Sequence, residues 1–155
     1  FEVVCPTRNF LSANTSHLTP LLCNERGEHA VLGLNTSVNT NDFSVGGILK
    51  YGEFEVMLTG DADRRVLPDQ VETGKLRAVE VLKVPHHGSK YGMEEDWLRR
   101  ISPQTAVISV GKNSYGHPAG ESISLLEKLG IRILRTDQEG DVEMVSDGKG
   151  RWIDN

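Results

Sequence analysis

The sequence predicts an α/β domain, and three observations lead to that prediction. The second half of the chain alternates strand-like and helix-like segments, which favours a sheet with helices packed on a face. The run Thr105–Val110 is β-branched and apolar almost throughout, as strands covered on both faces are. Residues 118–129 carry Ile123, Leu126 and Leu129 at helical spacing, which indicates a helix with one inward face.

Size and charge narrow the possible functions. At 155 residues the chain is long enough for one hydrophobic core, so we treat residues 1–155 as a single domain. The formal net charge of −5 argues against a broad nucleic-acid-coating surface, although a local phosphate site remains compatible with it. No apolar run approaches the roughly 18 residues of a membrane span. We therefore expect a soluble domain without a membrane segment of its own.

The first third of the sequence gives the weakest signals. Phe1–Cys5 predicts a short strand that Pro6 ends. Residues 7–20 are rich in Asn, Ser and Thr and predict a loop, and residues 21–24 and 29–34 predict a weak hairpin. Because the sequence begins without Met and enters a strand at once, we expect the chain to be cut from a longer protein.

A hairpin of residues 43–50 and 53–58 is the clearest feature before the midpoint. Tyr51-Gly52 is expected to supply its tight turn. In the second strand, apolar residues alternate with Glu53, Glu55 and Met57, so one face should be buried. The side chains expected on that buried face are Phe54, Val56 and Leu58.

The remaining elements follow from periodicity and from helix-ending residues. Residues 62–73 have helical spacing that Pro68 interrupts, which predicts a short or broken helix. Gly130 is expected to end the helix at 118–129. The other expected elements are strands at 78–84, 105–110, 131–134, 141–145 and 151–153, and a helix at 94–101.

Polar side chains with metal-binding or acid–base chemistry follow three predicted strands. Asp61 follows an apolar strand and a glycine, His86 and His87 end another apolar run, and His117 follows a third strand and its loop. A divalent metal that activates water needs His nitrogens and carboxylate oxygens. We interpret the three loops together as a candidate metal site.

Each of these residues also has a purely structural interpretation. Asp61 can serve as a turn residue, because Asp bonds its own backbone well. His117 can be a helix-entry residue next to a proline. His86 and His87 should point in different directions, so both cannot be core residues. One of the pair could bind a metal or an anion while the other packs or relays a proton.

Taken in order, these motifs resemble the metallo-β-lactamase superfamily, and specifically its ComEC-type DNA-uptake branch. The resemblance spans roughly residues 41 to 152. It rests on Asn41-Asp42-Phe43-Ser44, Leu58-Thr59-Gly60-Asp61-Ala62, Val81-Leu82-Lys83-Val84-Pro85-His86-His87-Gly88-Ser89, Ala106-Val107-Ile108-Ser109-Val110-Gly111-Lys112-Asn113, Tyr115-Gly116-His117-Pro118 and Arg135-Thr136-Asp137. It implies an αββα sandwich hydrolase, of which this chain would be the C-terminal part.

The resemblance also implies roles for single residues. It implies two metal ions, zinc or manganese, with Asp61 as a bridging ligand and His117 as a late ligand. His86 or His87 would contact the substrate phosphate or protonate the leaving group, and the choice between them stays open. The residues expected to bind substrate are Ser89, Lys90, Asn113 and Tyr115.

One departure from the family pattern shapes the expected function. The chain lacks the His-x-His/Asp-x-Asp-His segment that the resemblance places before its first strand. We therefore expect a weakly active or inactive half-domain, associated with a missing N-terminal half or with itself, from a phosphodiesterase or nuclease that acts on DNA. The alternatives are a non-catalytic binding or assembly module, and a hydrolase of another phosphoester or ester.

Overall fold

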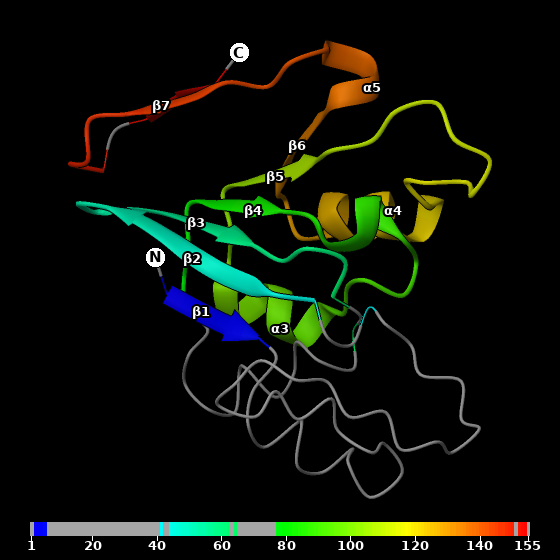
Figure 1. Cartoon of the computed structure of the whole chain (residues 1–155), viewed down its shortest axis with the longest axis horizontal. Coiled ribbons are helices and arrows are strands. Elements are labelled where there is room, and N and C mark those ends of the chain that lie inside the picture. The colour runs from blue at the N-terminus through cyan, green and yellow to red at the C-terminus, as the bar shows by residue number, and fades with distance from the viewer. Residues whose placement is uncertain are drawn as a thin grey trace, which may run out of the picture.

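A six-stranded mixed sheet forms the centre of the molecule (Figure 1). The computed structural model describes residues 2–5, 41, 44–62, 64, 77–150 and 152–154. The strands run in sequence order across the sheet and are β1 Glu2–Cys5, β2 Gly46–Tyr51, β3 Phe54–Leu58, β4 Val81–Lys83, β5 Thr105–Ile108 and β6 Arg132–Arg135. A separate two-stranded sheet consists of β7 Met144–Ser146 and β8 Trp152–Asp154. The α/β fold class predicted from the sequence is confirmed.

The helices follow the strands in the second half of the chain. They are the 3₁₀ turn η2 Pro85–Gly88 and the α-helices α3 Glu95–Ile101, α4 Gly120–Lys128 and α5 Thr136–Glu139. The predicted helices at 94–101 and 118–129 are confirmed as α3 and α4, whereas η2 and α5 are additional. In the described part of the chain, no helix has the length and apolar character that a membrane crossing requires.

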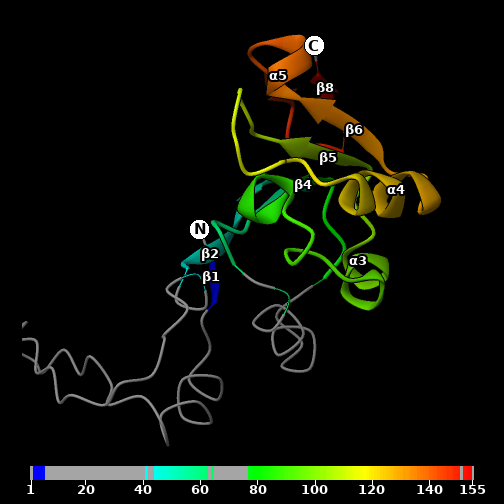
Figure 2. The same cartoon turned by 90° about the vertical axis from the view of Figure 1, so that its right-hand side faces the viewer.

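Strand β2 runs opposite to the other five strands of the sheet. β1, β2 and β3 are antiparallel neighbours, and β3, β4, β5 and β6 are parallel neighbours. Crossovers between parallel strands are right-handed, so consecutive strands added in one direction leave their helices on one face. Figure 2 shows α3 and α4 on the same side of the sheet. Because β3, β4, β5 and β6 are parallel, their carboxyl ends lie at one common edge of the sheet.

The hydrophobic core lies between that sheet face and the two helices. Met57, Leu82 and Ala106 are register partners on β3, β4 and β5, and each is completely buried. The helices contribute Trp97, Leu98, Ile101 and Leu126, which are also completely or almost completely buried. This core fixes the positions of the strands whose ends carry the candidate residues.

The predicted buried face of β3 is only partly right, since Phe54 on that face is 7% exposed but the opposite face is buried as well. Met57 is completely buried and Glu55 is 6% exposed on the helix-covered face, whereas Leu58 is 37% exposed. Glu55 tolerates burial because Lys50 Nζ and Arg77 Nε each lie 2.7 Å from its carboxylate oxygens. The alternation of apolar residues does not predict the burial of Glu55 and Met57, because it treats a glutamate with two cationic partners as a surface residue.

The predicted hairpin turn is displaced by one residue. Tyr51 belongs to β2 and pairs with Phe54, so the turn consists of Gly52 and Glu53. Gly52 has φ +60, and a Cβ atom there would lie 1.9 Å from the Gly148 carbonyl oxygen. The turn therefore requires glycine both for its backbone conformation and for the close approach of the β7–β8 connection.

The second face of the sheet is only partly covered. Phe54 packs on Trp152 of β8, with ring centroids 5.8 Å apart. Glu53 N donates a hydrogen bond to Gly148 O, which attaches the β7–β8 hairpin at the amino end of β3. Apolar side chains on β2 and β3 remain substantially exposed, namely Leu49, Tyr51 and Leu58.

Several predictions lie outside the described residues. The loop at 7–20, the weak hairpin at 21–34 and most of the broken helix at 62–73 stay predictions for that reason. The predicted strand at 1–5 corresponds to β1, and the predicted strand at 141–145 corresponds to β7, which begins three residues later.

Candidate functional site

The carboxyl ends of three adjacent parallel strands carry the candidate residues. Asp61 lies three residues after β3, His86 and His87 lie in the turn that follows β4, and His117 lies in the loop after β5. Open parallel sheets bind ligands at this edge, because the loops that follow neighbouring strands meet there. The juxtaposition expected from the sequence is confirmed.

The turn that carries the two histidines has an unusual backbone. His86 has φ 46 and ψ 46, and His87 has φ 53 and ψ 26. Residues other than glycine rarely adopt this left-handed backbone region, and those that do are often found at functional sites. Two backbone bonds hold the turn, from His86 N to Gly60 O and from Ala119 N to Gly88 O. The turn is thus connected to the loops on both sides of it.

His87 connects two of the three loops. Its Nδ1 atom lies 2.6 Å from the carbonyl oxygen of Ser109. Because a carbonyl only accepts hydrogen bonds, Nδ1 carries a proton and the lone pair of the neutral ring falls on Nε2. That Nε2 atom lies 3.6 Å from Asp61 Oδ1, which is too long for a direct hydrogen bond. Both Nε2 of His87 and Oδ1 of Asp61 carry lone pairs, so a cation or a proton donor that contacts both atoms would be stabilised there.

His86 faces a different set of neighbours. The Asn41 side-chain nitrogen lies 3.3 Å from its Nδ1 atom. An amide nitrogen donates, so Nδ1 of His86 accepts and its proton falls on Nε2. The ring lies edge-on to His117, with centroids 5.4 Å apart and planes at 67°. The two neighbouring histidines therefore differ in tautomer as well as in direction.

His117 is half-buried, as are His86 and Asp61. Within the described part of the chain, its Nδ1 atom is buried and has no hydrogen-bond partner. Burial lowers the pKa of His117 below its usual range, the nearby His86 and His87 lower that pKa further, and Asp61 acts in the opposite direction. A buried ring nitrogen with no partner has the properties of a ligand atom.

Asn113 holds the loop that carries His117. Its Oδ1 atom accepts hydrogen bonds from the backbone nitrogens of Tyr115 and His117. Its Nδ2 atom donates to the carbonyl oxygens of Gly111 and His117. The predicted contact of Asn113 with substrate stays a prediction, and the side chain also has a clear structural role in positioning His117.

The other predicted substrate-binding residues differ in accessibility. Tyr115 is 82% exposed, and its ring stacks on His117 with centroids 6.0 Å apart. Ser89 is buried, and its hydroxyl accepts a long hydrogen bond from Tyr91 N at 3.4 Å. Lys90 is exposed. Tyr115 and Lys90 can therefore reach a bound molecule without rearrangement.

The described residues supply part of a metal site. Asp61 offers a carboxylate and His117 offers an unpartnered ring nitrogen, which fits two of the ligands expected from the sequence. Among the residues described, no group of three or more His, Cys, Asp or Glu side chains is arranged to hold a metal ion. A complete coordination shell would need further ligands.

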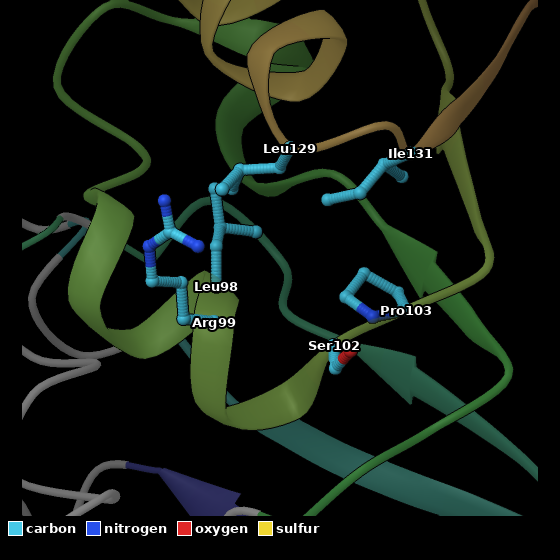
Figure 3. Close-up of a pocket in the computed structure, with 6 residues that line it drawn as sticks. All are labelled: Leu98, Arg99, Ser102, Pro103, Leu129 and Ile131. Carbon is cyan, nitrogen blue, oxygen red and sulfur yellow. The ribbon is translucent and has the colours of Figure 1, made fainter.

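A pocket lies away from this edge (Figure 3). Leu98 and Arg99 from α3 face Leu129 and Ile131 across it in the close-up. Ser102 and Pro103 complete the lining. Because Pro103 and Ile131 precede β5 and β6, the pocket lies at the amino ends of those strands. It is therefore separate from the candidate site.

Two contacts of the site were not anticipated from the sequence. Asn41 was part of a recognised motif, but its contact with His86 spans 45 positions. Tyr91 has two cations over its ring, Arg64 and Lys90. The position of Lys90, three residues after His87, indicates that it lies near the site. Nothing local in the sequence indicates that Arg64 contacts Tyr91.

The fold and the site define an α/β protein with Asp and His residues at the carboxyl edge of its parallel strands. No protein-family model matches this sequence. The chain is 38% identical over 96 residues to ComE operon protein 3 of Bacillus subtilis (strain 168), which covers 61% of this chain and 12% of that protein. It is 32% identical over 94 residues to Recombination protein 2 of Haemophilus influenzae, covering 60% of the chain and 12% of that protein.

A third relative has a similar name and coverage. The chain is 33% identical over 102 residues to Competence protein ComA of Neisseria gonorrhoeae, covering 64% of the chain and 14% of that protein. The names of the three relatives refer to the ComE operon, to recombination and to competence. The chain spans about an eighth of the length of these proteins.

Proposed function

We propose that this chain is part of a metal-dependent phosphodiesterase of the ComEC-like, metallo-β-lactamase type that cleaves DNA during its uptake. The observation that carries the proposal is the gathering of Asp61, His86, His87 and His117 at one sheet edge. The names of the relatives support a role in competence and therefore DNA as the substrate.

Metal binding is assigned to Asp61 and His117. Bound zinc or manganese ions would supply an activated water and would polarise the phosphate. The unpartnered Nδ1 atom of His117 and the Asp61 carboxylate support these ligand roles. The remaining ligands would come from a segment outside this chain, which is why the chain alone is expected to have little or no activity.

The other residues orient the substrate and transfer a proton. Ser109 O fixes Nδ1 of His87, so the lone pair on Nε2 would first accept a proton, and the resulting imidazolium would give that proton to the leaving oxygen. Lys90 would neutralise a phosphate oxygen of the bound substrate. Tyr115 would pack against the nucleoside next to the scissile bond, because its ring is exposed at the same edge.

The role of each histidine can be tested in a longer protein that contains this chain. His117→Ala should reduce bound zinc or manganese. His87→Ala should lower DNA hydrolysis more than it lowers metal content, because His87 acts on the substrate in this proposal. Equal loss of metal in both variants would refute this division of roles, and the absence of hydrolysis by the unsubstituted protein would refute the proposed activity.

A second candidate function is a non-catalytic assembly module. The incomplete ligand set among the described residues and the exposed apolar side chains of β2 and β3 favour it. Leu49, Tyr51 and Leu58 would then pack against another part of the parent protein or against a second copy. Analytical sedimentation of the chain alone tests self-association. If the chain sediments as a monomer, this face does not bind a second copy and would pack against another part of the parent protein.

A further inference from the structure

Tyr91 holds two cations next to the candidate site. The guanidinium carbon of Arg64 lies 5.5 Å from the centroid of the Tyr91 ring. The Lys90 ammonium lies 4.8 Å from the same centroid. Both distances fall within the roughly 6 Å range of a cation–π interaction. One exposed ring thus gathers two positive charges from separate loops.

These two loops are the ones that carry the candidate catalytic residues. Arg64 lies three residues after Asp61, and Lys90 lies three residues after His87. Arg64 N donates a hydrogen bond to Tyr91 O at 2.9 Å, which joins the loops directly. Three residues span at most about 10 Å of backbone, so the backbone positions of Arg64 and Lys90 lie close to those of Asp61 and His87.

The two charges remain available to an anion. Lys90 has no carboxylate partner among the described residues, and Tyr91 is 49% exposed. The carboxylate paired with Arg64 is that of Glu94 at 3.8 Å, and both side chains are 47% exposed. Such exposed pairs contribute little stability. A bound anion would attract both cations and would offset the repulsion between these two like charges.

We infer that Arg64 and Lys90 bind a backbone phosphate of single-stranded nucleic acid beside the cleavage position. This inference rests on the proposed function and extends it, because a second phosphate contact selects a polynucleotide over a small phosphoester. Tyr115, which is 82% exposed, offers a surface for base stacking on the same edge. An anionic membrane is a poorer fit, since lipid recognition uses clusters of about four to eight cations and the chain has a net charge of −5.

The inference can be tested by fluorescence anisotropy with the whole 155-residue chain. The probe is a labelled oligothymidylate, titrated over a series of salt concentrations. Arg64→Gln and Lys90→Gln should each weaken binding. The double variant should also reduce the slope of log affinity against log salt by about 0.7, the value for one phosphate contact on a single strand, and each single variant should reduce it by part of that amount. Far-ultraviolet circular dichroism confirms that the variants are folded.

Lys149→Gln is the matched control. It removes the same charge from an exposed turn beside Gly148, at the amino end of β3 and therefore opposite the site. It should leave the affinity and the salt slope unchanged. Glu94→Gln should tighten binding, because it removes the carboxylate that competes for Arg64.

Other results would overturn the inference. Unchanged salt slopes in both Arg64→Gln and Lys90→Gln would exclude the phosphate contact, whatever the hydrolase assay shows. Binding to phosphatidylserine vesicles that depends on these two residues, with oligothymidylate binding independent of them, would identify a lipid site instead. Conversely, a chain that binds oligothymidylate with the expected slopes supports the inference even if the parent protein does not hydrolyse DNA.

Discussion

The carbonyl oxygen of Ser109 lies 2.6 Å from Nδ1 of His87. This contact places the proton of the neutral ring on Nδ1 and directs the lone pair on Nε2 toward Asp61. A backbone atom at the end of β5 thereby sets the chemistry of a side chain that follows β4. The site depends on the register of these two strands, and not only on the residues it contains.

Asn113→Ala should weaken zinc binding by about tenfold, as the loss of a residue that orients a ligand typically does. Asn113 makes hydrogen bonds through both side-chain atoms within the loop that carries His117. Because Asn113 is exposed, the melting temperature should change little. Calorimetric titration with Zn²⁺ measures the affinity. Asn113→Asp, which keeps the Oδ1 acceptor, should lose less, and an unchanged affinity in Asn113→Ala would show that the loop does not need this side chain.

Gly88→Ala should destabilise the chain more than Gly116→Ala. Both glycines have positive φ, +79 and +76, so both substitutions carry a backbone cost of about 1–2 kcal/mol. At Gly88 the added Cβ would also lie 2.7 Å from Pro118 Cβ, whereas at Gly116 it would meet open space. Urea denaturation measures both variants. Equal losses would indicate that the η2 turn can move away from Pro118.

Met57→Ala and Leu58→Ala test which face of β3 is buried. Met57 is completely buried against α3 and α4, so its truncation should cost about 2–5 kcal/mol of unfolding free energy. Leu58 is 37% exposed on the other face and should cost clearly less. Chemical denaturation distinguishes the two, and a larger loss for Leu58→Ala would mean that its face is covered in solution.

Glu55→Gln should reduce stability in a pH-dependent way. The hydrogen bond from Arg77 lowers the pKa of Glu55, burial opposes this, and Lys50 lowers the pKa further. A carboxylate with a lowered pKa stabilises the fold above its unfolded pKa, and this contribution is lost as pH falls through the folded value. The variant should therefore lose about 1–3 kcal/mol at neutral pH.

The pH series supplies the control for Glu55. As pH falls below about 4.5, the ordinary value for glutamate, the difference between Glu55→Gln and the unsubstituted chain should shrink. Denaturant titrations at several pH values measure this difference. A gap that stays constant from neutral to acidic pH would show that the charge of Glu55 does not contribute.

Most strands and helices after residue 43 were predictable because their signals are local. Helical spacing predicted α4, and a continuous β-branched run predicted β5. The burial of Glu55 on β3 was not predictable in this way, because its partner Arg77 lies 22 positions away. A pattern of apolar residues does not reveal that a charged residue has distant partners.

The same distinction applies to the candidate site. Asp61, His86, His87 and His117 were recognised because each follows a predicted strand, and parallel strands bring such ends together. The tautomers of His86 and His87 depend on Asn41 and Ser109, which lie in other loops. The η2 turn is held by the bond from His86 N to Gly60 O. The cations over Tyr91 also come together only in the folded chain.

Titration of a longer protein that contains this chain with Zn²⁺, followed by nuclear magnetic resonance of the histidine ring nitrogens, tests the proposed metal site most directly. We predict that the ring signals of His117 shift on zinc addition and that Asp61→Asn weakens this binding by about tenfold or more. Ring signals of His117 that stay unchanged, or an affinity that is the same in Asp61→Asn, would contradict the assignment of these two residues as metal ligands.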